Sequence, residues 1–168
     1  MTPDDVLSFW FGPPGSSPFE NEPVWWRKDD AFDTTVRERF GAAIDDAGAG
    51  RLASWEAAPR SSLALVILMD QFSRNAYRGT PRSFALDRAA LDVVRRMIAR
   101  RADTELGPAE RAFVYLPFMH AEDLAAQDEG LVCFAILVEE TPEALRPKVL
   151  NNLIFGVKHR RIIERFGR

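Results

Sequence analysis

Apolar residues recur along most of the chain at spacings of three and four, which is the period of one face of an α-helix. The segment 30–47 illustrates the pattern, because Phe32, Val36, Phe40 and Ala43 fall on one side of a helix there. No segment shows the sustained alternation of apolar and polar residues that is typical of a half-buried strand. The pattern predicts an all-α protein.

Capping residues, glycines and prolines divide this pattern into seven or eight helices. The first is expected to be capped by Thr2, to begin at Pro3 and to end before Gly12. We expect the others at about residues 30–47, 60–75, 80–102, 108–115, 121–139 and 141–165. Pro117 is expected to kink or end its helix, whereas Pro147 fits the first turns of the last one. Short loops join most helices, so neighbours are expected to pack antiparallel as stacked helical hairpins.

The most apolar part of the chain is the run from Leu63 to Met69. Periodicity alone allows either a buried strand or a buried helix here. The length of the segment and its polar continuation from Asp70 to Asn75 favour a helix. A helix that is apolar nearly all round belongs in the middle of a bundle.

Length and composition limit the classes of protein to consider. The 168 residues suit one all-helical domain, 1–168, and 46% hydrophobic and 28% charged residues are ordinary for a globular chain. The net charge of −3 gives no electrostatic reason to expect nucleic acid as a partner. The N-terminus does not resemble a signal peptide, and the longest apolar run is far short of the roughly 20 residues of a membrane span. We therefore expect a cytoplasmic protein with no membrane partner, and an inert buried thiol at Cys133.

The residues after the apolar run are the first candidates for chemistry. Asp70 ends an apolar stripe, and Arg74 lies one turn away on the same side. A carboxylate in such a place is either an acid with a tuned pKa in a pocket or half of a structural Asp–Arg pair. Gln71 and Asn75 form a second pair one turn apart, and Arg78 is close by.

A second group of candidates follows Pro117. His120 and Asp123 share a helical face, Glu122 lies between them, and Gln127 falls one turn beyond Asp123. A histidine beside carboxylates suits acid–base work or a metal. With only two histidines in the chain, we predict no metal site. The structural alternative is a helix start at which the two acids interact with first-turn amides.

The last helix contributes His159, which lies on an apolar stripe with Phe155, Ile162 and Phe166. A histidine on such a stripe is either a satisfied core residue or a ligand-binding group. The same helix has a basic end, formed by Lys158, Arg160, Arg161, Arg165 and Arg168. That end suits an anion, although Arg160 and Glu164 are also placed to form an internal pair.

Five sets of residues carry a resemblance to a known family. They are Leu7–Gly12, Asp70–Asn75 with Arg78–Pro81, Phe84–Asp87, Pro117–Asp123 with Gln127, and His159–Arg168. In these motifs the chain resembles the bacterial family catalogued as domain of unknown function 924. The resemblance implies an all-helical stack of hairpins like that of tetratricopeptide repeats, and it implies no established activity.

The chain differs from the family pattern in three places. Ser73 stands where the family usually has proline, and Ala121 stands where it usually has serine. The family pattern also continues past Arg168 into a Phe-Pro-His-Arg-Asn stretch, which lies outside this sequence. By comparison with the family pattern, the helix end at Ser73 is less rigidly set, and a cap or hydroxyl partner beside His120 is missing at position 121.

Two functions are compatible with these residues. The first is a binding module for a peptide, a protein or a small anionic ligand. The alternative is a small-molecule enzyme with Asp70 and His120 in acid–base chemistry, and with Arg74 and His159 holding an anionic substrate. Candidates for catalysis are Asp70, His120 and Glu122, and candidates for ligand binding are Gln71, Arg74, Asn75, Arg78, Asp123, Gln127 and His159. We expect no cofactor, since the chain has no Gly-rich phosphate loop and none of the common catalytic motifs. Convergence of the candidates on one pocket favours an enzyme or small-ligand protein, whereas separate ion pairs favour a binding scaffold.

Overall fold

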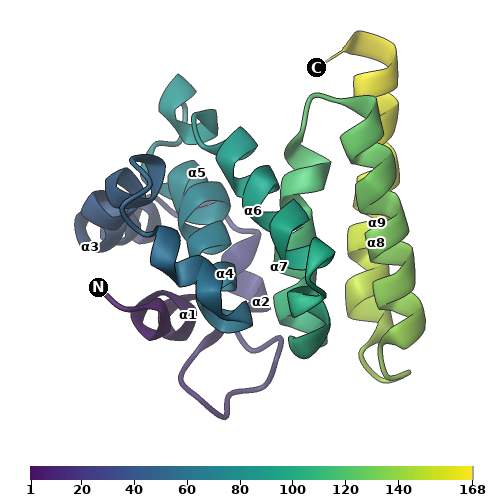
Figure 1. Cartoon of the computed structure of the whole chain (residues 1–168), viewed down its shortest axis with the longest axis horizontal. Helices are drawn as coiled ribbons and strands as arrows, with labels where there is room; N and C mark the ends of the chain where they lie inside the picture. The colour runs from purple at the N-terminus through teal and green to yellow at the C-terminus, as the bar shows by residue number, and fades with distance from the viewer. Residues whose placement is uncertain (168) are drawn as a thin grey trace.

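The computed structural model describes residues 1–167, and all the regular secondary structure in that range is helical (Figure 1). The α-helices are α1 (Pro3–Phe11), α2 (Glu22–Trp25), α3 (Asp30–Gly48), α4 (Pro59–Val66), α5 (Ser73–Ala76), α6 (Asp87–Ala99), α7 (Pro108–His120), α8 (Leu124–Glu140) and α9 (Arg146–Phe166). Three short 3₁₀ helices, η1 (Ala53–Ala57), η3 (Pro81–Phe84) and η4 (Ala102–Glu105), and the π-helix η2 (Ile67–Phe72) complete the set. Because α4, η2 and α5 follow without a break, the described residues form eight separate α-helical segments. The all-α prediction is confirmed.

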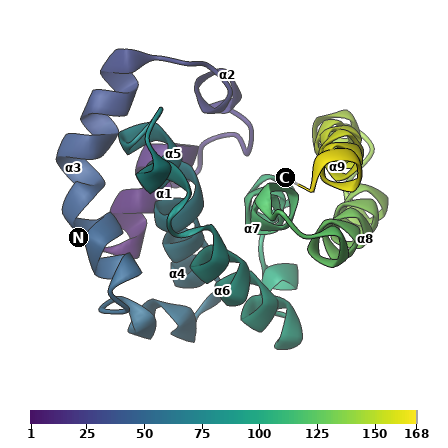
Figure 2. The same cartoon turned by 90° about the horizontal axis from the view of Figure 1, so that it is seen from above.

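The continuous helix made of α4, η2 and α5 lies at the centre of the molecule. Its residues from Leu63 to Phe72 are buried, and α1, α3, α6 and α7 pack around it (Figure 2). The prediction that this run is a central helix is therefore correct. The apolar surface on all sides of the helix is matched by neighbours on all sides, which is what burial of a nonamphipathic helix requires.

Local capping follows the predicted chemistry at the N-terminus. The Thr2 hydroxyl accepts a hydrogen bond from the backbone N–H of Asp5, and the Asp5 carboxylate accepts one from the backbone N–H of Thr2 at 2.7 Å. This reciprocal pair satisfies two amides that the first turn would otherwise leave unpaired. Asp29 caps α3 in a similar way through the amides of Ala31 and Phe32.

Several predicted helix boundaries are wrong, and three of them lie near prolines. Helix α7 runs through Pro117 to His120, because the buried residues around Pro117 pack well enough to outweigh one lost backbone hydrogen bond. Residues 80–86 form η3 and a turn, and α6 begins only at Asp87, since the exposed Phe84 offers no apolar face toward the core. Helix α9 begins at Arg146, which keeps Pro147 in the first turn, where a missing N–H costs nothing.

Helices α8 and α9 form an antiparallel hairpin at one end of the molecule, drawn green and yellow in Figure 1. The hairpin packs on α7, and no other helix of residues 1–167 packs on the opposite side of α8 and α9 (Figure 2). The repeat-like stacking implied by the family resemblance remains a prediction. Among the described residues, none of the helices combines the length and the apolar character needed to cross a bilayer.

Candidate functional site

The π-helix η2 is the local feature that places Asp70. A π-turn widens the helix by one residue, and such turns are rare and frequent at functional sites. The Ser73 hydroxyl donates a hydrogen bond to the carbonyl of Leu68, five residues back, at 3.2 Å. The widened turn carries Asp70 with a side chain that is 0% exposed.

Three donors converge on the Asp70 carboxylate. Gln71 Nε2 donates to Oδ2 at 2.6 Å, while Arg74 Nη1 donates to Oδ1 at 3.0 Å. His120 Nδ1 lies 2.8 Å from the same Oδ1. Because an ionised carboxylate only accepts hydrogen bonds, Nδ1 is the protonated nitrogen of the imidazole, and Nε2 is left as the free one. Asp70 and His120 therefore form an oriented acid–imidazole pair.

His120 is the last residue of α7, and the turn that follows holds it in place. The Gln127 amide donates to the carbonyls of Met119 and Ala121, at 2.6 and 2.8 Å, on either side of His120. Asp123 caps α8 by accepting from the backbone N–H of Ala126 at 2.7 Å. Gln127 and Asp123, both predicted as ligand-binding residues, thus have structural contacts that fix the α7–α8 turn.

Arg74 links the buried acid to a second carboxylate. Its guanidinium makes two parallel hydrogen bonds to Asp87, both at 2.9 Å, in addition to its contact with Asp70. Such a bidentate arrangement fixes the guanidinium plane. The side chain of Arg74 is only 21% exposed, so the two acids hold most of its hydrogen-bonding capacity.

The pKa values of Asp70 and Asp87 are shifted in opposite directions. Burial by itself would raise the pKa of Asp70, but the charges of His120 and Arg74 and the hydrogen bonds from His120 and Gln71 outweigh it and lower the pKa. Burial raises the pKa of Asp87 despite Arg74, and the nearby charge of Asp70 adds to that rise. Asp70 is therefore ionised at neutral pH and is able to orient and stabilise a protonated His120.

A cavity of about 830 Å³ opens beside this pair, between α6, the end of α7, the start of α8 and the end of α9. Its polar lining consists of Arg74, Asp87, Arg88, Arg95, His120, Glu122, Asp123 and His159. Its apolar lining includes Phe84, Leu91, Met119, Ala126, Ile162 and Ile163. A cavity of this size, lined by both polar and apolar side chains, suits a small organic ligand.

His159 of α9 also lines the cavity, and its Nδ1 is held by the protein as that of His120 is. Its Nδ1 lies 2.9 Å from the carbonyl of Phe155, which makes Nδ1 the donor and leaves Nε2 free. The cavity is thus lined by two imidazoles, each with one nitrogen held by the protein. Glu122 also lines the cavity and has no ion-pair partner among the described residues.

The predicted site residues divide between two places. Arg74, His120, Glu122, Asp123 and His159 line the cavity, and Asp70 and Gln71 support it from beneath. Gln127 lies in the α7–α8 turn, and Asn75 and Arg78 lie away from the cavity.

Asn75 and Arg78 bind Asp33 of α3. Asn75 Nδ2 donates to Asp33 at 2.7 Å, and Arg78 makes two hydrogen bonds to the same carboxylate, at 2.5 and 3.1 Å. These bonds join the end of α5 to α3, away from the residues that line the cavity. Burial opposes ionisation of Asp33, but Arg78 and Asn75 prevail and lower its pKa. This cluster is a structural joint between two helices.

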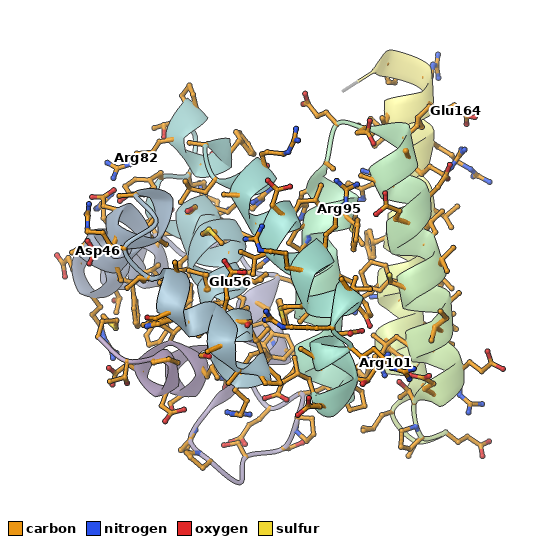
Figure 3. The ribbon with its side chains drawn as sticks, viewed as in Figure 1. Asp46, Glu56, Arg82, Arg95, Arg101 and Glu164 are labelled. Carbon is orange, nitrogen blue, oxygen red and sulfur yellow. The ribbon has the colours of Figure 1, made fainter. Side chains whose placement is uncertain are left out.

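Asp87, Arg88, Arg95 and Phe84 line the cavity and were not predicted as site residues. Arg95 extends from α6 toward α8, where Glu129 accepts two hydrogen bonds from it at 3.1 and 2.8 Å (Figure 3). Asp87 and Phe84 belong to a motif that carries the family resemblance, and this was the one available signal for them. Arg88 and Arg95 lie in a stretch of the sequence that also contains Arg96, Arg100 and Arg101, and such a basic flank is typical of a solvated helix face.

The cavity lining contains no serine, threonine, cysteine or tyrosine within the described part of the chain. Cys133 is outside it, and burial raises the pKa of this thiol to about 11, which keeps it protonated at neutral pH. No cluster of three or more His, Cys, Asp or Glu side chains in residues 1–167 has a geometry for holding a metal ion. The groups in the cavity are therefore suited to proton transfer and charge recognition.

Comparison with known proteins identifies the family. The family described as "Bacterial protein of unknown function (DUF924)" matches residues 6–168. The chain belongs to this family. A solved structure, described as a protein of unknown function, ATU0120, from Agrobacterium tumefaciens, is 35% identical to this chain and superposes on it with a TM-score of 0.81. That match covers 99% of this chain and 84% of the other. None of the curated proteins matches the chain.

Proposed function

We propose that this member of the family is an enzyme that acts on a small molecule, with His120 as its general base and general acid. The observation that carries the proposal is the buried Asp70 at 2.8 Å from His120 Nδ1, with His120 lining an 830 Å³ cavity. A carboxylate in this position selects the tautomer in which Nε2 is free to take a proton, and it stabilises the imidazolium that results. Asp70 is the positioning residue in this scheme, because its side chain does not reach the cavity.

The lining suggests how the chemistry proceeds. Without a hydroxyl or thiol nucleophile in the described lining, His120 would act on water or directly on an acidic C–H of the substrate. In the first case Nε2 takes a proton from water as the oxygen attacks an ester, amide or similar centre. The same proton then returns to the leaving group. In the second case Nε2 removes a carbon-bound proton and then returns a proton to carbon. The substrate is thereby isomerised, or its C–H proton is exchanged with solvent.

The charges support a substrate with an anionic group. Arg74, Arg88 and His159 line the cavity. Of the arginines that line it, Arg88 has the weakest ion pair, with Asp92 at 3.5 Å, and its side chain is 85% exposed. Arg74 contributes a weaker field, since Asp70 and Asp87 offset its charge. Glu122 offers an acceptor on another side of the cavity for a hydroxyl or ammonium group.

The proposal is tested with a panel of small carboxylate-containing and phosphate-containing esters, amides and carbonyl compounds. Incubation in D₂O followed by NMR detects C–H exchange, and mass spectrometry in ¹⁸O-labelled water detects hydrolysis. For any compound that is converted, His120→Gln is expected to lower kcat by about 10²–10⁴-fold with little change in KM. Asp70→Asn is expected to lower kcat by a similar factor, because it permits the wrong tautomer of His120.

The matched control is Asn75→Ala, which alters a buried polar residue outside the cavity. It should leave kcat and KM unchanged in folded protein. Full activity of His120→Gln with a converted compound would overturn the acid–base role. Thermal unfolding of each variant separates loss of activity from loss of fold.

A second candidate is a binding module for a small anionic ligand in the same cavity. It is favoured by the ion pairs that already occupy Arg74 and Arg95, which leave His120 and His159 as the main reactive groups. Compounds that raise the melting temperature but are never converted by wild-type protein would support binding over catalysis. Loss of that stabilisation in Arg88→Gln would locate the ligand in the cavity.

A further inference from the structure

The outer face of the α8–α9 hairpin carries four exposed aliphatic residues. Val132 and Ile136 of α8 and Leu150 and Ile154 of α9 are between 41% and 59% exposed. Helical spacing places each pair opposite the residues that its helix buries toward α7. We call these four residues the hairpin face.

The four residues lie at the same level along the hairpin. Arg160 of α9 forms an ion pair with Asp128 of α8 at 2.5 Å, and Leu131 is the nearest neighbour of Gly156. This antiparallel register puts the middle of the Val132–Ile136 pair beside the middle of the Leu150–Ile154 pair. Among the described residues no other helix packs on that side (Figure 2), so the four exposed apolar side chains share one uncovered face of the hairpin.

The two helices of the hairpin carry opposite charges. Helix α8 contains no lysine or arginine, and its charged residues are Asp128, Glu129, Glu139 and Glu140. Helix α9 has one acid, Glu164, which lies near its end (Figure 3), and six basic residues, namely Arg146, Lys148, Lys158, Arg160, Arg161 and Arg165. A surface built from one acidic and one basic helix is complementary to itself when it is turned so that unlike helices meet.

We propose that the hairpin face binds the hairpin face of a second copy of this chain. The two-fold axis runs parallel to the helices, so that α8 of each copy packs on α9 of the other. An axis across the helices would instead place α8 on α8 and α9 on α9, which sets like charges against each other. The parallel axis is therefore the arrangement that the charges favour.

One ion pair follows from this geometry and occurs twice. Arg161 projects from the same side of α9 as Ile154, is exposed, and has no ion-pair partner among the described residues. Its level on the hairpin is close to that of Asp128, because Asp128 already contacts the adjacent Arg160. In the proposed dimer, Asp128 of each copy faces Arg161 of the second copy, at the edge of the hairpin face.

The size of the face indicates a dimer of modest affinity. Helices of 17 and 21 residues are roughly 25 and 30 Å long, and two side by side are roughly 20 Å wide. Such a footprint is at the lower end of stable protein interfaces, which bury about 800 Å² per partner. We expect a dissociation constant of about 1–100 μM.

Sedimentation velocity on the full chain, from about 0.5 to 200 μM, tests the dimer itself. The sedimentation coefficient is expected to rise with concentration from that of a monomer to that of a dimer. A chain that stays monomeric at every concentration overturns the proposal, and the hairpin face would then belong to another partner. This outcome is independent of any result on the cavity.

Ile136→Glu and Phe166→Glu are the matched variants. Both replace an exposed apolar residue by a carboxylate, but Phe166 lies on a different side of α9 from the hairpin face. Ile136→Glu is expected to weaken dimerisation at least about tenfold, whereas Phe166→Glu leaves it unchanged. Equal effects of the two substitutions, or no effect of Ile136→Glu, contradict the proposed face. Circular dichroism confirms that each variant keeps its helical content.

A charge exchange tests the orientation of the axis. Arg161→Asp and Asp128→Arg should each weaken the homodimer, because each variant pairs like charges twice. An equimolar mixture of the two variants should form heterodimers, in which both pairs again join unlike charges. Failure of the mixture to associate better than either variant alone would rule out the parallel axis, even if the chain dimerises.

Discussion

Asp70 shares its two oxygens among Gln71, Arg74 and His120, and this sharing decides its ionisation. An unpaired carboxylate with no exposure to solvent would be neutral, since burial disfavours the charged form. Three donors on one carboxylate reverse that preference. The acid is thereby charged at neutral pH, and His120 is held in one tautomer.

Asp70→Asn should therefore destabilise the protein and change its response to acid. We expect a loss of about 2–4 kcal/mol in the free energy of unfolding at pH 7, because a buried charge partner of His120 and Arg74 is removed. The folded-state pKa of Asp70 is lowered, so its contribution is complete above the unfolded pKa of about 3.9 and is lost as the pH falls further. Urea unfolding at pH 7 and at pH 3 should show a smaller difference between wild type and variant at pH 3. A difference that grows on acidification would contradict the lowered pKa.

Asn75→Ala tests the cluster of Asp33, Asn75 and Arg78 that joins α5 to α3. It removes one of the hydrogen bonds to Asp33 while Arg78 keeps its ion pair, so we expect a loss of about 1–2 kcal/mol in unfolding free energy. Chemical denaturation measures the loss, and titration with any compound found to bind the cavity measures affinity. A reduced affinity would show that this cluster and the cavity are coupled.

At the scale of elements, the site depends on the turn between α7 and α8 and on close packing behind it. Gln127 ties down the carbonyls on both sides of His120, and Asp123 starts α8 directly after. Gly130, two turns into α8, allows α8 to approach α7 closely, because a Cβ at this position would lie 2.5 Å from the Cβ of Phe118. The position of His120 is therefore set by the contact between two helices.

Gly130→Ala is expected to lower stability more than Gly156→Ala does. A new methyl group at position 130 meets the Cβ of Phe118, which cannot move without its helix, and should cost about 1–3 kcal/mol. At position 156 the nearest atom is a terminal methyl of Leu131 at 3.0 Å, which can rotate away. Thermal unfolding of the two variants measures both changes. Equal melting temperatures would contradict the close α7–α8 contact.

At the scale of the whole molecule, burial falls from the centre toward the α8–α9 hairpin. The helix from α4 to α5 is enclosed by four others, whereas α9 buries only Val149 and Gly156 among its described residues. Helices α8 and α9 pack mainly on each other and on α7, at the end of the molecule shown in Figure 1. Single ion pairs also link α8 to α6 through Arg95 and Glu129, and α9 to α2 through Lys148 and Glu22. The cavity lies where this less buried hairpin meets the enclosed part, so opening of the hairpin would change its shape.

Hydrogen exchange should reproduce this gradient. At concentrations where the chain is monomeric, amides of α4 and η2 are expected to exchange slowest and those of α9 fastest among the long helices. Mass spectrometry of peptides after deuterium labelling measures the order. Concentrations above the dissociation constant of the proposed dimer should slow exchange in α8 and α9 selectively. Faster exchange in α4 than in α9 would contradict the gradient.

Local patterns in the sequence were sufficient for the helical class, the cap at Thr2 and the central position of the segment after Leu63. Each of these depends on residues within a few turns of one another, whose spacing is visible in a linear chain. The helix boundaries near Pro81, Pro117 and Pro142 were predicted wrongly. Pro117 lies inside α7 because tertiary packing outweighs its local effect, whereas the helices expected to start near Pro81 and Pro142 begin later, at Asp87 and Arg146. The π-turn at Asp70 had no local signal either.

Which polar residues meet was decided only by the tertiary structure. Asp70 and Asn75 are five residues apart, yet one turns to His120 across 50 positions and the other to Asp33 across 42. The sequence identified both as chemically able but contained nothing to separate a cavity residue from a structural one. That choice depends on which distant helix packs on each side of the central one, and hence on contacts that have no periodicity along the chain.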